Sequence, residues 1–124
     1  MAEFKNIQPG PFGPYSTCAI TDDFIYLAGQ VPLTGEGEVI GEDLYTQTRA
    51  VLAQILQVLS SLKISPDRLV LLRVYTTRLE EADQINKAFT EVLTPPYPAR
   101  ELVGVAALPR GVYVEIAAIA ENRR

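Results

Sequence analysis

Arg100 and Glu115 are the two side chains of this 124-residue chain whose types and settings best suit chemistry. Arg100 follows the stretch PPYPA (residues 95–99), which restricts the backbone because proline fixes its own φ and confines the preceding residue to extended geometry. A guanidinium held in this way suits bidentate capture of a carboxylate. The plainer alternative is a surface arginine at the end of a strand.

Glu115 lies inside the apolar run VYVEIAAIA (residues 112–120) and shares one side of the predicted strand with Tyr113 and Ile119. Glutamate is seldom fully buried unless it is paired. Burial would raise its pKa, whereas a nearby arginine would lower it. A partly shielded carboxylate beside a cation and water can act as a general acid and base. The alternatives are a structural ion pair and an exposed strand position.

Histidine is absent, which excludes Ser-His-Asp and Cys-His catalysis and the usual zinc ligand sets. Gly35 to Glu38 is acidic and no lysine follows it, so it is not a phosphate-binding loop. Any catalysis must therefore use carboxylates, arginine, hydroxyls, backbone groups and water. Cys18 has no histidine to activate it and is expected in the core as a small apolar residue.

The composition bounds the class of protein. A net charge of −4 argues against a nucleic-acid partner. One cysteine allows no internal disulfide, so the cytoplasm is the expected location. No apolar run approaches the ~20 residues of a membrane span, and the N-terminus lacks the apolar core of a signal peptide. The length predicts a single domain over residues 1–124.

The elements that must position these side chains follow from periodicity. Residues 42–62 carry a helical apolar stripe, with Glu42 and Asp43 at the positive end of the helix dipole. A capping box at 77–80 predicts the start of a second helix, and Pro95-Pro96 ends it. Residues 1–14 are expected to be irregular. The strands are predicted over 16–20, 24–27, 69–76, 102–107 and 112–120, with a further short one at 38–40.

This order predicts an α+β fold with one sheet and two helices. The last two strands are apolar on both sides, and such strands are normally covered on both faces. Two helices can cover only one face. We therefore expect the other face to be buried against copies of the same chain.

Several short motifs, taken in order, carry a resemblance to one family. Together they are similar to the RidA family of reactive intermediate deaminases, also called the YjgF family, from about Gly13 to Ala120. The motifs are GPYS (13–16), GQVP (29–32), QT (47–48), YPAR (97–100), VAALP (105–109) and VEIAAIA (114–120).

The resemblance implies a chorismate-mutase-like fold and a homotrimer with clefts between subunits. The sheet is expected to be mixed, with the two helices on one face. The implied activity is hydrolysis of short-lived enamines and imines, such as 2-aminoacrylate, 2-iminobutanoate and 2-iminopropanoate, to 2-keto acids and ammonia. No cofactor or metal is implied.

The resemblance also assigns roles. Arg100 would bind the substrate carboxylate, and Glu115 would orient or activate the attacking water. Gly29 would contact the substrate through its backbone, and Tyr15 would line the cleft, from the adjacent subunit. Asn86 matches a recurrent helix asparagine. From the residues alone, Gly29 also fits a bulge or turn, and Tyr15 also fits packing. Asn86 also fits a solvent-facing position or a side-chain-to-backbone hydrogen bond.

Two positions depart from the family pattern. Ala28 stands where many members have serine, and Leu102 stands where some have cysteine. Alanine at position 28 lacks the serine hydroxyl and so removes a possible hydrogen bond to a ligand, typically worth ~1 kcal/mol net. Leucine at position 102 makes that part of the cleft wall larger and purely apolar. Both changes bear on substrate range and rate.

Two functions of other classes stay open beside the deaminase. One is a non-catalytic trimeric binder that uses Arg100 to sense small carboxylates. The other is a chaperone-like or translation-affecting role, including the RNA cleavage reported for some relatives. The acidic charge weighs against direct work on RNA.

Overall fold

The computed structural model describes residues 1–8 and 10–124 and contains one six-stranded sheet and two α-helices. The helices are α1 (Leu44–Ser61) and α2 (Ala82–Val92). The strands are β1 (Glu3–Lys5), β2 (Cys18–Ile20), β3 (Phe24–Gln30), β4 (Leu69–Thr76), β5 (Ala99–Gly104) and β6 (Val114–Glu121). Within the described residues, neither helix is long and apolar enough to span a bilayer.

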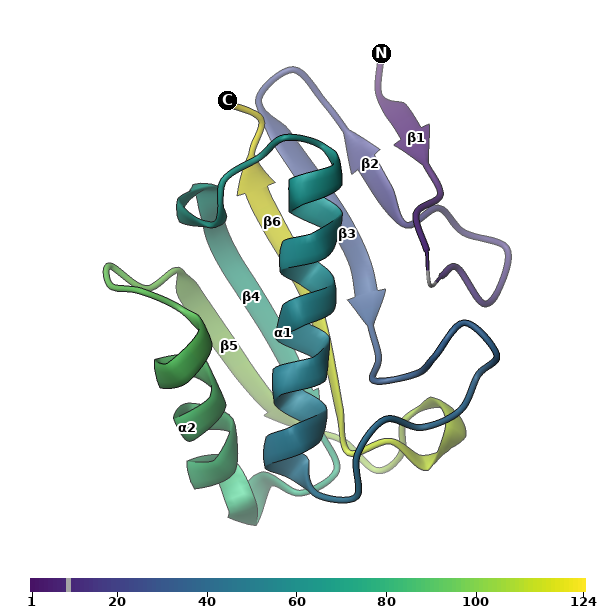
Figure 1. Ribbon diagram of the computed structural model, residues 1–124, viewed down its shortest axis with the longest axis vertical. Coiled ribbons are helices and arrows are strands. Elements are labelled where there is room, and N and C mark those ends of the chain that lie inside the picture. Colours follow the sequence, from purple (N-terminus) through teal and green to yellow (C-terminus); the bar gives the residue numbers. More distant parts are fainter. Residues whose placement is uncertain (9) are drawn as a thin grey trace.

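The sheet runs in the order β1-β2-β3-β6-β4-β5. β4 and β5 pair in parallel and every other neighbouring pair is antiparallel, so the sheet is mixed. Both helices lie against the same face, with α1 in the middle and α2 beside β5 (Figure 1). The predicted α+β class and the placement of both helices on one face are confirmed.

Helix α1 joins three parts of the fold. Asp43 caps it by accepting a hydrogen bond from the Thr46 amide at 2.7 Å. Gln47, fully buried, accepts from the Tyr113 amide at 2.7 Å and donates to the Gly41 carbonyl at 3.2 Å. Its side chain therefore ties the loop before α1 to the start of β6. This explains a glutamine on the buried side of the helix.

The core lies between the helices and the sheet. The inward side chains of β6 and β4, including Ile116 and Leu72, are fully buried against Ile55 and Leu59 of α1. Cys18 is 1% exposed within this cluster, as predicted. Because alternate residues of a strand point to opposite faces, the residues between them, Glu115 among them, face away from the helices.

Three element predictions are corrected. β1 forms within the stretch expected to be irregular, because it needs only backbone pairing with β2 at the sheet edge. β5 begins at Ala99 rather than at 102, so Arg100 lies inside the strand. Residues 38–40 form no strand, only a bridge between Leu33 and Val39.

The predicted capping box is wrong. The Thr77 amide donates to the Tyr113 carbonyl at 3.2 Å, just beyond the end of β4, and the Thr76 hydroxyl accepts from the Arg78 amide. A 3₁₀ turn, Leu79–Glu81, then leads into α2.

The face of the sheet away from the helices is open in the single chain and carries large apolar side chains. Phe24, Tyr26 and Val103 are 39%, 43% and 41% exposed. Monomeric proteins seldom expose extended apolar patches. Burial of this face against further copies stays a prediction.

Candidate functional site

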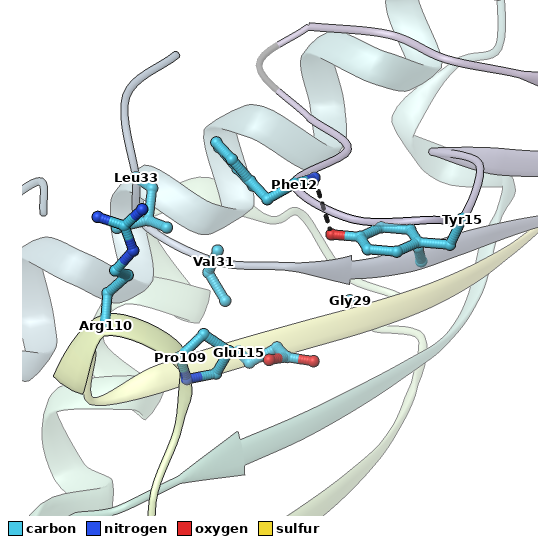
Figure 2. A pocket seen from close by; sticks show the side chains of 9 residues that line it. Phe12, Tyr15, Gly29, Val31, Leu33, Pro109, Arg110 and Glu115 are labelled. Carbon is cyan, nitrogen blue, oxygen red and sulfur yellow. Dashed lines mark hydrogen bonds between the residues drawn. The ribbon is translucent and has the colours of Figure 1, made fainter. Parts of the chain in front are cut away.

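A hollow of about 570 Å³, here called the Glu115 hollow, opens beside β3 and β6. Figure 2 shows Glu115 pointing into it, with Tyr15 and Gly29 on one side and Arg110 on the other. The lining residues are Phe12, Tyr15, Ala28, Gly29, Val31, Leu33, Pro109, Arg110 and Glu115. Three of the predicted binding residues therefore line the same hollow as Glu115, the predicted general acid and base: Tyr15, Ala28 and Gly29.

A bulge in β3 shapes one wall of this hollow. Leu27 pairs with Ala118 and Gln30 with Ile116, so Ala28 and Gly29 together lie opposite a single residue of β6. The Ala28 amide donates outward to the Thr17 carbonyl at 2.8 Å. Gly29 thus lies in a bulge, one of the two alternatives left open by the sequence, and the bulge brings its backbone against Glu115.

The Glu115 carboxylate is partly buried, and burial raises the pKa of this group above its ordinary value. The structure gives it no hydrogen bond or ion pair with any residue in the described part of the chain. Desolvation without a compensating cation is the physical cause of the shift. A carboxylate with a raised pKa and free acceptor sites can take a proton from water and return it.

Tyr15 is held at the rim of the hollow. Its hydroxyl accepts a hydrogen bond from the Phe12 amide at 3.2 Å, shown as a dashed line in Figure 2. The residue remains 48% exposed. The tyrosine therefore holds the lead-in segment and also lines the hollow, and its contribution to a cleft between subunits stays a prediction.

Arg100 lines a second, smaller hollow of about 240 Å³, here called the Arg100 hollow, together with Asn86, Phe89, Thr90, Tyr97 and Pro98. Its Nη1 donates to Asn86 Oδ1 at 2.8 Å, and its guanidinium carbon lies 5.1 Å from the centre of the Phe89 ring. Neither contact neutralises the charge, and no carboxylate among residues 1–8 and 10–124 forms an ion pair with it. The cation is thus oriented by α2 and exposed for an anion.

The sheet separates the two hollows. Arg100 pairs with Leu72, which is buried beneath the helices, and its side chain contacts α2. Glu115 pairs with Tyr75, whose side chain belongs to the opposite face. Within one chain, therefore, Arg100 and Glu115 do not face the same hollow. They could meet only if the two groups come from different copies.

Of the two remaining predicted residues, Asn86 lines the Arg100 hollow and Leu102 does not line either hollow. Asn86 contacts Arg100 directly, which neither the solvent-facing nor the backbone-bonding alternative anticipated. Leu102 is partly buried and packs against the main core. Among the lining residues that were not predicted from the sequence are Phe12, Phe89 and Arg110. Only Arg110 carried a signal, as the one cation in the turn before the last strand.

Among the residues described, no group of three or more metal-binding side chains gathers. The polar side chains that line the two hollows are one carboxylate, two guanidiniums, one amide, two phenols and one aliphatic hydroxyl. This set can bind an anion and transfer protons.

Known proteins of one family are similar to this chain along nearly its whole length. The family model described as "Endoribonuclease L-PSP" matches residues 6–122. A "putative regulator AldR" of Lactococcus lactis is 32% identical over 114 residues, which cover 91% of this chain and 90% of that protein. A RutC family protein of Pyrococcus horikoshii is 34% identical over 118 residues, 94% of each chain.

Solved structures are equally similar. RidA from the Antarctic bacterium Psychrobacter sp. superposes with a TM-score of 0.86 at 32% identity, covering 91% of this chain and 92% of that one. TdcF of E. coli, crystallised with bound serine, gives a TM-score of 0.87 at 29% identity, with 98% and 99% covered.

Proposed function

Since the chain belongs to the RidA (YjgF) family, we propose that it hydrolyses reactive 2-imino and 2-enamine acids to 2-keto acids and ammonia. The observation that carries the proposal is the Glu115 carboxylate, which is partly buried, has no partner in the described residues and faces a hollow beside the Gly29 bulge. The expected substrates are 2-aminoacrylate, 2-iminobutanoate and 2-iminopropanoate.

The site we propose is shared between subunits of a homotrimer. Arg100 and Asn86 of one copy would meet Tyr15, Gly29 and Glu115 of the next. Two features support this arrangement. Arg100 is exposed on β5, the edge strand, and Glu115 belongs to the sheet face whose apolar side chains no helix covers. Burying that face would bring an edge of one copy toward the hollow of another.

The chemistry follows from the groups present. Arg100 would hold the substrate carboxylate, with Asn86 fixing the direction of the guanidinium. An enamine first takes a proton at its β-carbon and becomes the iminium form. Water then attacks C2 while Glu115 accepts its proton. The same carboxyl group returns that proton to nitrogen. The C–N bond then breaks as the C2 hydroxyl gives its proton to the Glu115 carboxylate, so that ammonia and the 2-keto acid leave and the carboxyl group releases the proton to solvent.

The rate enhancement that this reaction needs can come from the few groups of the proposed site. Positioned acid and base groups typically contribute ~10²–10⁴-fold in rate. A raised pKa at Glu115 brings proton uptake and return closer to neutral pH. The relative crystallised with serine supports an amino-acid-like ligand for this fold, since serine carries the same carboxylate and 2-nitrogen as the proposed substrates.

The experiment generates the substrate in place. A pyridoxal-phosphate dehydratase acting on threonine supplies 2-iminobutanoate, and semicarbazide competes for the imine. The chain should lower semicarbazone yield and speed keto-acid release. Arg100→Ala should raise KM by ~10–100-fold, the equivalent of ~1.5–3 kcal/mol for a charge-assisted hydrogen bond. Glu115→Gln should lower kcat by ~10²-fold or more while carboxylate binding persists.

Arg123→Ala is the matched control, because it removes a guanidinium whose side chain is 68% exposed outside both hollows. A chain that binds carboxylates but leaves keto-acid release unchanged would instead be a non-catalytic binder. Cleavage of RNA that survives Arg100→Ala would favour the activity in the family model's description. Unaltered turnover in Arg100→Ala would exclude the role proposed for that residue.

A further inference from the structure

Arg110 is a second cation that shares the Glu115 hollow, and the proposed chemistry does not use it. Figure 2 shows its guanidinium beside Leu33, with Val31 between it and the Glu115 carboxylate in this view. Arg110 Nη1 donates to the Gly37 carbonyl at 3.3 Å, and the described residues place no carboxylate within ion-pair distance. Five other arginines do have such a partner: Arg49, Arg68, Arg73, Arg78 and Arg123.

The backbone at Arg110 is unusual for an arginine. Its φ is 58°, and that of the following Gly111 is 70°, both in the left-handed region. Glycine adopts this conformation at no steric cost, whereas an arginine there is strained. A strained position that retains a long charged side chain lining a hollow indicates that the side chain has a function.

The Arg110 guanidinium packs against the backbone of Gly37. The φ of Gly37 is 83°, and a Cβ at Gly37 would lie 3.3 Å from both Nη atoms of Arg110. The absence of a side chain there lets the guanidinium lie against the backbone, where it donates one hydrogen bond, to the Gly37 carbonyl. Most of its five N–H groups stay available to a ligand.

The hollow between Glu115 and Arg110 suits a longer substrate than a three- or four-carbon acid. Its volume of about 570 Å³ falls in the range of pockets for drug-sized ligands. The walls between the two charged groups are apolar, and they are formed by Phe12, Val31 and Leu33. A ligand that fills the hollow would thus have its reacting carbon at Glu115, an apolar middle and an anionic end at Arg110.

We propose that Arg110 selects 2-imino acids whose side chain ends in a carboxylate, so that the assembled site favours 2-imino dicarboxylates. This inference rests on the proposed function, because it names the substrate class of the same site. Arg100 of the neighbouring copy takes the 1-carboxylate and Arg110 takes the distal one. The reaction itself is unchanged: water adds at C2, the C–N bond breaks and ammonia leaves.

The test compares two imines that differ at the end of the side chain. An amino-acid oxidase converts glutamate or methionine, which have unbranched side chains of similar length, to the 2-imino acids in place. Keto-acid release is then measured with wild type, Arg110→Gly and Arg110→Lys. Arg110→Gly suits the positive φ, so the fold should persist, which thermal melting checks.

We expect wild type to have the higher kcat/KM for the glutamate-derived imine. The ratio of the two kcat/KM values should fall at least tenfold in Arg110→Gly and less in Arg110→Lys. An unchanged ratio in Arg110→Gly, or a wild-type preference for the methionine-derived imine, overturns the inference but leaves the deaminase standing.

Calorimetry tests Arg110 without turnover. Wild type should bind 2-oxoglutarate more tightly than 4-methylthio-2-oxobutanoate, and Arg110→Gly should remove the difference. If neither imine is hydrolysed, the deaminase proposal fails, and this binding ratio alone decides whether Arg110 recognises a distal carboxylate. Equal binding of both keto acids by wild type would count against it.

Discussion

Gly29 and Glu115 are fitted to each other so closely that no other residue can replace the glycine without moving the carboxylate. A Cβ built on Gly29 would lie 2.2 Å from Glu115 Oε2 and 2.9 Å from its Cδ. Heavy atoms do not approach so closely without a bond, so the missing side chain is what leaves room for the carboxylate. The bulge in β3 and the acid on β6 therefore form one unit.

Gly29→Ala should reduce activity far more than stability. The methyl group would meet the flexible end of a glutamate, which can rotate away at little cost to the fold. The displaced carboxylate would no longer hold water at the substrate, and we expect a loss of ~10–100-fold in kcat, since small misplacements of catalytic groups have effects of this size. Kinetics and thermal melting of the same preparations measure both quantities.

A double mutant separates displacement of Glu115 from general damage. If Gly29→Ala acts through the carboxylate, it should lower kcat little further in a Glu115→Gln background. Gly35→Ala is the matched control, because a Cβ at Gly35 meets nothing within 4 Å. Equal losses in both backgrounds would show that Gly29 acts in some other way.

Glu115 should make folding stability depend on pH in a definite direction. Burial raises its pKa in the folded chain above the value of 4.5 for an unperturbed glutamate, so the folded state binds more protons between those two pKa values. Its contribution is therefore fully present below pH 4.5 and is lost as pH rises through the folded pKa. Relative to wild type, Glu115→Gln should become more stable as pH rises through that window.

Denaturant midpoints of wild type and Glu115→Gln, measured at fixed protein concentration from pH 4 to 8, check this sign. A difference that stays constant with pH would mean that the carboxylate is not desolvated. A difference that grows toward acid pH would mean that a cation stabilises its charged form.

Asn86→Asp should occupy Arg100 with an internal partner. The amide oxygen already accepts from Arg100 Nη1 at 2.8 Å, so a carboxylate at the same place would form an ion pair with it. The substrate carboxylate would have to displace that pair, and we expect KM to rise by about tenfold, or ~1.4 kcal/mol, with kcat less affected. Gln57→Glu, which adds the same charge on the exposed side of α1, is the control. An unchanged KM in Asn86→Asp would show that Arg100 does not bind the substrate.

Helices and strands with a periodic pattern of buried residues can be predicted from the sequence. Strands that form only because their backbone pairs with a neighbouring strand cannot. Helix α1 and strand β4 follow from their apolar spacing. β1 could not be predicted, because Glu3, Phe4 and Lys5 are all exposed and show no alternation. The start of β5 was placed late because Arg100 and Glu101 resemble a loop, although an edge strand tolerates charge on both sides.

Six of the seven predicted site residues line one of the two hollows, but how the two hollows are arranged does not follow from the sequence. Residue types singled out Arg100 and Glu115, and motif order added Tyr15, Gly29 and Asn86. Which face Arg100 occupies depends on its register with Leu72, and that register is a long-range property that no local pattern contains. Arg110 is visible in the sequence as a cation in a turn, but nothing local predicts that its side chain lines the Glu115 hollow.

Mixing two impaired variants, assayed at a substrate concentration below KM, tests whether the site is shared between copies. Arg100→Ala retains an intact Glu115, and Glu115→Gln retains an intact Arg100. If each site takes its arginine from one subunit and its glutamate from the next, random assembly of equal amounts should restore about a quarter of the sites, since each of two independent choices has even odds. Activity is measured after unfolding and refolding the two variants together, and separately refolded variants mixed without exchange serve as the control. If co-refolding restores no activity although the subunits exchange, Arg100 and Glu115 cannot be acting across an interface; because the sheet keeps them apart within one chain, the deaminase mechanism proposed for them would fall with that result.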